Sequence, residues 1–214
     1  MFNAQEVDYG THFCNIYRNK YEQISVLIPY LVSGLRNHEK CVYVYDEFSP
    51  DEICRLIVES GIDAQKYLET KQLVLLPAKE TYLTKGFFSS ERMLEAIQEL
   101  YYETLKSGFK GLRGAGEMQW YLSDPPGAFG LLDYENRINV VVPKLRCFVL
   151  CQYDEARFKE DILAGVIRTH PEVIMHGNRH KNPFYIKPDL FSAKSREEYF
   201  KGTYTWLRDN IISN

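Results

Sequence analysis

The chain has 214 residues, of which 45% are hydrophobic and 26% are charged, and its formal net charge is −3. This length and composition suit a globular domain with a substantial hydrophobic core. The small negative charge gives no electrostatic basis for direct binding to nucleic acid or to an acidic membrane surface. The sequence contains neither a long apolar run nor a signal-peptide pattern, so we predict a cytoplasmic protein without a membrane span.

Short apolar strands alternate with helical patterns along most of the chain. The patterns predict strands at residues 12–18, 40–45, 72–76, 111–112 and onward, 146–152 and 172–175. They predict helices at residues 21–35, 50–61, 89–106, 131–142 and 155–169. This alternation is typical of a mostly parallel central sheet with helices on both faces, so the predicted fold class is α/β.

Residues 110–120, KGLRGAGEMQW, combine two closely spaced glycines with an arginine, a carboxylate and a tryptophan. Gly114 and Gly116 would let the strand bend or approach another group closely. Arg113, Glu117 and Trp120 could then line a pocket at the end of the sheet, where open α/β folds place their ligands. The alternative is a tight turn in which Trp120 packs in the core and Arg113 pairs with Glu117.

The segment between the first strand and the first helix argues against nucleotide hydrolysis. Residues 17–23 contain no glycine and no Gly-Lys-Ser/Thr sequence, both of which a phosphate loop requires. The GxSxG, HExxH and GxGxxG motifs are also absent from the sequence. The residue pattern therefore predicts no ATP hydrolysis and no standard catalytic site.

A metal site can be drawn from His12, Cys14, Cys151 and His170. Histidine and cysteine suit zinc or another transition metal, but none of these residues has the close spacing of a zinc finger. Buried thiols and a hydrogen-bonded histidine would explain the same residues. The sequence favours this second interpretation and identifies no cofactor.

Two carboxylates and the His170-Pro171 pair are further candidates for chemistry. Glu117 and Glu135 could face one pocket as an acid–base pair, or each could be solvated or paired with an arginine. His170 could be a pocket residue at the end of a helix or a cap for that helix. The sequence favours the non-catalytic role for the carboxylates and, slightly, the cap for His170.

An ordered set of motifs resembles the MEDS domain, the methanogen/methylotroph sensory domain of the dichloromethane regulator DcmR. The resemblance covers roughly residues 8–186. Its motifs are HxCxxY (12–17), PYLxxGLxxxEKCxY (29–43), GxxGLR (108–113), GEMxW (116–120), YE (134–135), CxYD (151–154) and HP (170–171). It implies a degenerate relative of KaiC/RecA-like ATPase domains that lacks the phosphate loop and senses one-carbon or hydrocarbon-derived compounds.

The resemblance also implies partners, because such domains commonly precede a histidine kinase, a PAS domain or a DNA-binding helix-turn-helix. No kinase core or helix-turn-helix is recognisable in this sequence. We therefore predict a sensory domain at residues 8–186 and a C-terminal helical extension or connector at residues 187–214, with an amphipathic helix at 194–212. A histidine kinase or DNA-binding regulator could be the output partner, and the chain could form a homo-oligomer.

The predicted function is binding of a small-molecule ligand in a signal-transduction or transcription-regulatory system. Two alternatives are an enzyme that uses Glu117 or His170 as an acid or base, and a degenerate ATPase-fold scaffold for assembly. The predicted ligand pocket lies at the carboxyl ends of the strands and is lined by His12, Cys14, Tyr17, Arg113, Glu117, Trp120, Glu135, Cys151, Tyr153 and His170.

Overall fold

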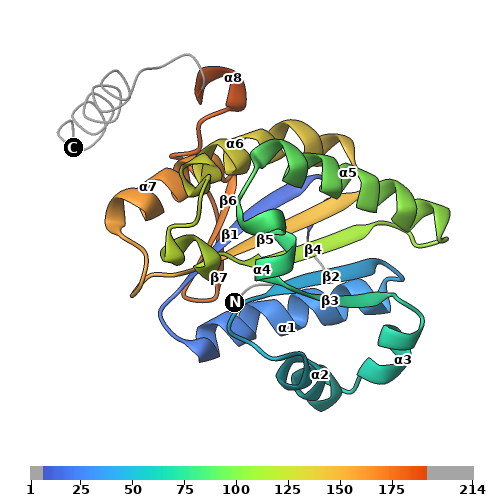
Figure 1. Ribbon diagram of the computed structural model, residues 1–214. Coiled ribbons are helices and arrows are strands. Elements are labelled where there is room, and N and C mark those ends of the chain that lie inside the picture. Colours follow the sequence, from blue (N-terminus) through green and yellow to red (C-terminus); the bar gives the residue numbers. More distant parts are fainter. Residues whose placement is uncertain (1–6, 192–214) are drawn as a thin grey trace.

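Residues 7–191 of the chain are described by a computed structural model, whose centre is a seven-stranded sheet (Figure 1). All neighbouring strands are parallel except for β6 and β7, which are antiparallel. In their order across the sheet the strands are β3 (Leu73–Pro77), β2 (Lys40–Tyr45), β4 (Leu112–Glu117), β5 (Cys147–Asp154), β1 (Thr11–Tyr17), β6 (Glu172–Met175) and β7 (Asn178–Lys181). The mostly parallel α/β prediction is confirmed.

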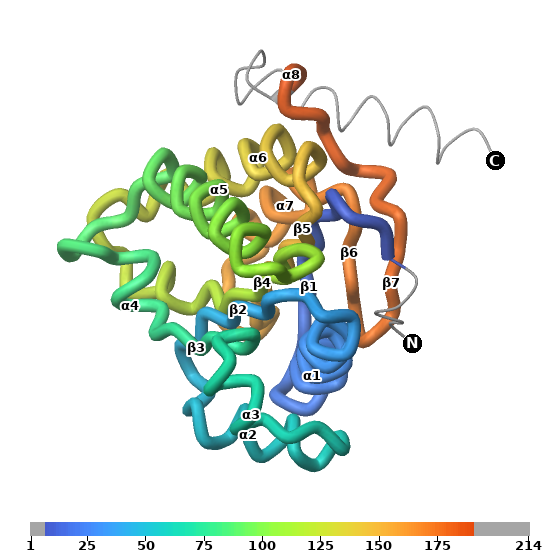
Figure 2. Tube along the Cα trace, turned by 90° about the vertical axis from the view of Figure 1, so that its right-hand side faces the viewer, coloured from blue at the N-terminus to red at the C-terminus, as the bar shows by residue number. Residues whose placement is uncertain are grey.

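Helices cover both faces of this sheet, with α1, α2 and α3 on one side and α5, α6 and α7 on the other (Figures 1 and 2). The helices are α1 (Lys20–Arg36), α2 (Pro50–Glu59), α3 (Ala64–Glu69), α4 (Ala78–Thr81), α5 (Ser90–Lys106), α6 (Leu131–Val141), α7 (Glu160–Thr169) and α8 (Pro188–Phe191). Short 3₁₀ turns are η1 (Thr84–Gly86), η2 (Gln119–Ser123), η3 (Ala128–Gly130) and η4 (Val142–Lys144). Within residues 7–191, no helix has both the length and the hydropathy that crossing a membrane requires.

Side-chain caps start several of these helices. The Ser49 hydroxyl accepts the Glu52 N–H and the Glu52 carboxylate accepts the Ser49 N–H, which makes a complete capping box with Pro50 in the first turn. The Asn19 side chain accepts the Glu22 N–H at the start of α1. Pro29 does not end α1, which continues to Arg36.

The sheet separates two hydrophobic cores, because successive side chains of a strand point to opposite faces. Phe13 of β1 packs with Leu27 and Leu31 of α1, and we call this side the α1 face. Cys14 of β1 packs in the other core with Ile138 of α6, and we call that side the α6 face. Side chains on the α1 face and side chains on the α6 face are therefore separated by the sheet.

Three details of the fold differ from the sequence prediction. Helix α7 begins at Glu160 instead of 155, because the Asp154 carbonyl and carboxylate accept N–H groups from residues 156–158 and hold a turn there. The short helix α3 and the polar strand β7 were not predicted. Strand β7 pairs with β6 through a tight turn in which His176 and Gly177 both have positive φ.

The division of the chain at residue 187 stays a prediction. The amphipathic helix predicted at residues 194–212 lies outside the residues that the structure describes.

The glycines of β4 give a matched test of close packing. Gly114 and Gly116 both lie within β4, which is paired on each side, so the backbone does not turn at either glycine. A methyl group on Gly116 would overlap the buried Tyr82 hydroxyl, whereas one on Gly114 would have its nearest neighbour, the Phe148 carbonyl oxygen, at 3.7 Å. The predicted close approach therefore occurs at Gly116 alone.

We expect Gly116→Ala to lower the free energy of unfolding by about 1–3 kcal/mol, because Tyr82 must move within a packed core. Gly114→Ala should be neutral or stabilising by up to about 1 kcal/mol, because alanine loses less backbone entropy in a strand. Urea unfolding of both variants measures the difference. Equal stability of the two variants would contradict this explanation.

Candidate functional site

The side chains predicted to bind one ligand lie on both faces of the sheet and do not line one pocket. Those on the α6 side are His12, Cys14, Trp120, Glu135, Cys151, Tyr153 and His170. Tyr17, Arg113 and Glu117 occupy odd-numbered positions of β1 and β4 that face α1. Strand side chains alternate between the faces, so these residues lie in more than one environment, and their joint binding of one ligand stays a prediction.

A buried polar cluster lies within the α6 face, and we call its four members His12, Glu135, Cys151 and His170 the His–Glu–Cys cluster. Glu135 Oε2 lies 3.2 Å from His12 Nε2, 3.4 Å from His170 Nε2 and 3.4 Å from Cys151 Sγ. Cys151 Sγ is also 3.5 Å from His12 Nε2. Each of these residues is at most 2% exposed. A polar group so buried needs partners, and the only polar side-chain atoms near Glu135 Oε2 that these contacts give are those of the cluster itself.

Four elements position the cluster. His12 comes from β1 and Cys151 from the neighbouring β5, on the face covered by α6 and α7. Glu135 comes from the buried side of α6, and His170 is the residue that ends α7. His170 Nδ1 lies 2.7 Å from the Val166 carbonyl oxygen of the last turn, as the predicted cap would, while its role as a ligand-binding residue stays a prediction.

The electrostatics of the cluster favour neutral His12 and ionised Glu135. Burial, and after it the nearby His170, lower the pKa of His12 to about 4. Burial by itself would raise the pKa of Glu135, but the two histidines outweigh burial and the pKa is lowered. Burial and the Glu135 carboxylate raise the pKa of the Cys151 thiol.

Cys14 was a candidate metal ligand, but it is not one of the four residues whose ligand atoms lie within 4.8 Å of one another. Glu135 takes its place in that set. The sequence does carry a signal for Glu135, because it occupies a helical stripe that otherwise consists of the buried Leu131, Tyr134 and Ile138. A carboxylate in such a stripe needs a buried partner.

Glu117 forms a separate network on the α1 face. Its Oε2 accepts the Asp46 N–H at 2.8 Å and the Glu47 N–H at 2.5 Å, while its Oε1 accepts the Tyr43 hydroxyl and the Gln23 amide. Burial raises the pKa of Glu117 to about 7, against the effect of these donors. Because Glu117 and Glu135 lie on opposite faces of the sheet, they do not form the acid–base pair considered from sequence.

Removing the Glu117 carboxylate should loosen the loop that follows β2. We expect Glu117→Ala to lower the free energy of unfolding by about 2–3 kcal/mol, because the Asp46 and Glu47 N–H groups lose a charged acceptor. Glu117→Gln keeps one acceptor oxygen and the side-chain volume, so its loss should be smaller. Chemical unfolding checks the order, and equal losses would show that neither the retained acceptor oxygen nor the side-chain volume stabilises the loop.

A cavity of about 460 Å³ opens at the carboxyl ends of β2, β4 and β5. It is lined by Asp46, Glu47, Gln119, Trp120, Leu122, Ser123 and Arg157, and we call it the carboxyl-end cavity. Among the described residues, Trp120 Nε1 and Gln119 Oε1 have no hydrogen-bond partner although both atoms are buried. Of the predicted ligand-binding residues, Trp120 alone lines this cavity.

Aromatic rings connect the carboxyl-end cavity to the His–Glu–Cys cluster. Trp120 contacts Tyr121 edge-on, Tyr121 stacks on Phe158, and Phe158 contacts Tyr153 edge-on, with centroid separations of 6.3, 5.9 and 5.1 Å. The Tyr153 hydroxyl donates a hydrogen bond to Glu135 Oε1. The cavity wall and the cluster therefore belong to one continuous set of packed side chains.

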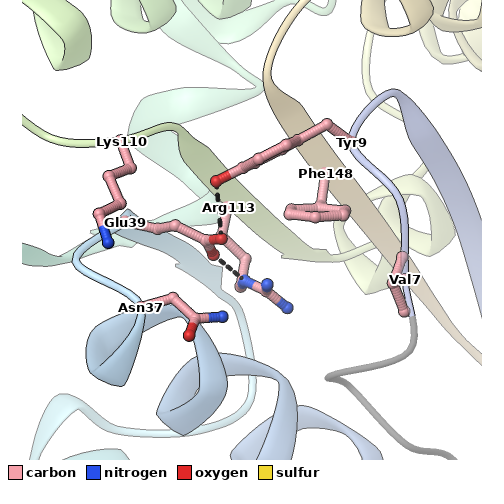
Figure 3. Close-up of a pocket in the computed structure, with 7 residues that line it drawn as sticks. All are labelled: Val7, Tyr9, Asn37, Glu39, Lys110, Arg113 and Phe148. Carbon is pink, nitrogen blue, oxygen red and sulfur yellow. Dashed lines mark hydrogen bonds and ion pairs between the residues drawn. The ribbon is translucent and has the colours of Figure 1, made fainter.

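Arg113 lies at the opposite, amino-terminal edge of the sheet (Figure 3). Its Nε donates to Glu39 Oε2 at 2.6 Å, and its guanidinium lies 4.8 Å from the Tyr30 ring centre and 4.3 Å from that of Phe148. Tyr9 also donates to Glu39, within a pocket of about 220 Å³ lined by Val7, Tyr9, Asn37, Glu39, Lys110, Arg113 and Phe148. The predicted position of Arg113 at the carboxyl end and its suggested pairing with Glu117 are both wrong.

These features define a mostly parallel α/β domain with buried polar groups on both faces of its sheet. A KaiC-like protein of known crystal structure, PH0186 from Pyrococcus horikoshii OT3, matches with a TM-score of 0.54 and 13% sequence identity. The match covers 78% of this chain and 71% of that one. At this identity the likeness shows the shared fold alone.

The chain belongs to the MEDS family, whose description is MEthanogen/methylotroph, DcmR Sensory domain, and the family model matches residues 11–171. The transcriptional repressor DcmR of Methylorubrum extorquens (strain DSM 6343 / CIP 106787 / DM4) is 23% identical to it over 170 residues. That match covers 79% of this chain but only 61% of the repressor. The His–Glu–Cys cluster falls entirely within the residues that the family model matches.

Proposed function

We propose that this chain is the small-molecule sensory domain of a transcription-regulatory or signal-transduction system. Its ligand would be a one-carbon or hydrocarbon-derived compound bound in the carboxyl-end cavity. Membership of a sensory-domain family and the similarity to a transcriptional repressor support the regulatory role. We propose that its output partner is a histidine kinase or a DNA-binding regulator.

One observation supports the cavity as the binding site. Trp120 Nε1 and Gln119 Oε1 have no hydrogen-bond partner among the described residues, and both belong to side chains that line the cavity. A buried donor and a buried acceptor without partners cost free energy. Both atoms are covered as the cavity wall stands, so a ligand with matching groups would recover that free energy once the wall shifts to admit it. Trp120 and Leu122 offer apolar contact beside them, which suits a small, partly apolar molecule.

Binding without ATP hydrolysis agrees with the local structure before α1. The backbone N–H groups at a helix start are the usual phosphate ligands. Here the Asn19 side chain accepts the Glu22 N–H, and the Glu22 carboxylate accepts the Arg18 N–H. The segment from residue 17 to 23 also lacks the glycines that a phosphate loop uses.

A ligand transmits a signal only if it binds two conformations with different affinity. The loop with Asp46 and Glu47 lines the cavity, and Glu117 holds that loop by its backbone N–H groups. An ion pair between Arg157 and Glu47 joins it to the segment after β5. We propose that this loop is the element whose position the ligand changes.

Trp120 provides an internal probe for the test. The only other tryptophan is Trp206, so Trp206→Phe leaves Trp120 as the single source of indole fluorescence. We expect a saturable change of Trp120 emission when a compound from a panel of halomethanes, methanol and methylamines is added. Leu122→Phe, which narrows the cavity, should weaken that binding by about tenfold or more, equivalent to 1.4 kcal/mol.

Leu105→Phe on the exposed side of α5 is the matched control, and it should leave the affinity unchanged. Equal weakening by both variants would mean that the compound does not bind in the carboxyl-end cavity. No saturable change with any compound of the panel would contradict the proposed ligand class.

A further inference from the structure

The hydrogen bonds of the two histidines determine which ring nitrogens face the cluster. Asn139 Nδ2 donates its two N–H bonds to the carbonyl oxygens of Glu135 and Thr169, so its Oδ1 is left to accept from His12 Nδ1 at 3.2 Å. His170 Nδ1 lies 2.7 Å from the Val166 carbonyl oxygen, which can only accept. When a ring is neutral, its proton is therefore on Nδ1, and its Nε2 presents a lone pair to the cluster.

Four electron-pair donors consequently converge: His12 Nε2, His170 Nε2, Glu135 Oε2 and Cys151 Sγ. The thiol can give its single proton to only one of the others, and in the described part of the chain His170 Nε2 has no hydrogen-bond partner. Lone pairs that face one another in a dry interior repel, and only a proton or a cation between them relieves that repulsion.

The separations of these atoms match a tetrahedron around a metal ion. Zinc bonds of about 2.0–2.3 Å to nitrogen, oxygen and sulfur place neighbouring ligand atoms about 3.3–3.8 Å apart in tetrahedral geometry. Four of the six separations between these atoms are 3.2, 3.4, 3.4 and 3.5 Å, close to that range. The other two are at most 4.8 Å, so the ligand atoms would have to draw together slightly around an ion.

The groups behind the ligands also match those of metal centres. Metal-bound histidines usually donate their other ring N–H to a carbonyl or amide oxygen, as His12 and His170 do here. Bound carboxylates are usually hydrogen-bonded on their second oxygen, as Glu135 Oε1 is by Tyr153. If the cluster only shared protons, His12, His170 and Glu135 would not all need to be held by a hydrogen bond on the side that points away from the cluster.

We propose that His12, Glu135, Cys151 and His170 bind one divalent transition-metal ion, best matched by Zn²⁺, between the sheet and helices α6 and α7. On binding, the Cys151 thiol releases its proton to solvent and the thiolate sulfur bonds to the metal. The thiolate and the Glu135 carboxylate balance the charge of the ion, so the buried site is neutral. This inference does not depend on the ligand proposed for the carboxyl-end cavity.

Such a centre would be closed, because the protein supplies all four ligands and each is at most 2% exposed. It would tie β1, β5, α6 and the end of α7 together, and the ion would enter as the chain folds. The aromatic contacts that begin at Trp120 end at Tyr153, which donates a hydrogen bond to Glu135. One ligand of the ion would therefore be linked to the wall of the carboxyl-end cavity.

The test uses the full chain purified without chelators. We expect elemental analysis to find one zinc per chain. After unfolding with a chelator, refolding with Co²⁺ should give one bound cobalt with tetrahedral visible bands and a near-ultraviolet thiolate charge-transfer band. Refolded protein that binds neither Zn²⁺ nor Co²⁺ after desalting, yet has native circular dichroism, would overturn the proposal.

Variants distinguish this site from other thiols. Cys151→Ser should abolish the charge-transfer band, while Cys14→Ser, in register beside it on β1, should keep both the band and the stoichiometry. Asn139→Ala should weaken metal binding by about 10–100-fold through loss of the His12 contact. Loss of the band in Cys14→Ser, or its retention in Cys151→Ser, would contradict the assignment.

Discussion

Glu135→Ala is expected to lower the free energy of unfolding by more than about 4 kcal/mol, among the largest effects of any single substitution in this chain. The Glu135 carboxylate is fully buried and contacts His12, His170, Cys151 and the Tyr153 hydroxyl. Its removal leaves these polar groups without their partner and opens a cavity in the core. Both effects add to the loss.

Glu135→Gln is the matched variant, because it keeps the volume and one acceptor oxygen. Its loss should be about 1–3 kcal/mol, since one acceptor among several hydrogen bonds is replaced by a donor. Chemical unfolding with circular dichroism compares the two. A Glu135→Ala variant about as stable as the wild type would mean that the cluster does not hold α6 and α7 against the sheet.

Glu39→Ala is expected to lower the free energy of unfolding by about 3–5 kcal/mol, because it leaves the Arg113 charge buried without its carboxylate. Arg113 is 1% exposed and Glu39 is 2% exposed, and the ion pair between them is 2.6 Å long. The cation–π contacts of Arg113 with Tyr30 and Phe148 would not replace a full charge.

Two controls separate charge from packing. Glu59→Ala removes a similar ion pair with Arg55 on the exposed side of α2, and its loss should be below about 1 kcal/mol. Combining Glu39→Leu with Arg113→Met replaces the buried pair by apolar groups and should recover most of the stability that Glu39→Ala loses. If the double variant is no more stable than Glu39→Ala, the loss comes from packing and not from the unpaired charge.

The sequence predicts the main helices and strands because their patterns and caps are local. Ser49, Pro50 and Glu52 specify the start of α2, and the β-branched and aromatic run at residues 40–45 coincides with β2. Strand β7 has no such pattern, because its NRHK sequence is held by the turn at Gly177 and by pairing with β6. Its presence follows from tertiary pairing alone.

The candidate site depends on information that local patterns carry only in part. Residue parity already assigns His12 and Cys14 to one face of β1 and Tyr17 to the other, so the single pocket could have been questioned from sequence. The position of Arg113, one residue after β4 begins, likewise indicates the amino-terminal edge. The meeting of Glu135 with His12 and Cys151 depends instead on how α6 crosses the sheet.

The central claim, that a small molecule binds in the carboxyl-end cavity, is tested most directly by nuclear magnetic resonance on the ¹⁵N-labelled chain. The compound to use is the one that changes Trp120 fluorescence. We predict that it shifts the Trp120 indole signal and the amide signals of Asp46, Glu47 and residues 119–123, while those of Asn37 and Lys110 in the amino-terminal pocket stay in place. Shifts confined to the amino-terminal pocket, or no shifts at saturation, would contradict the account.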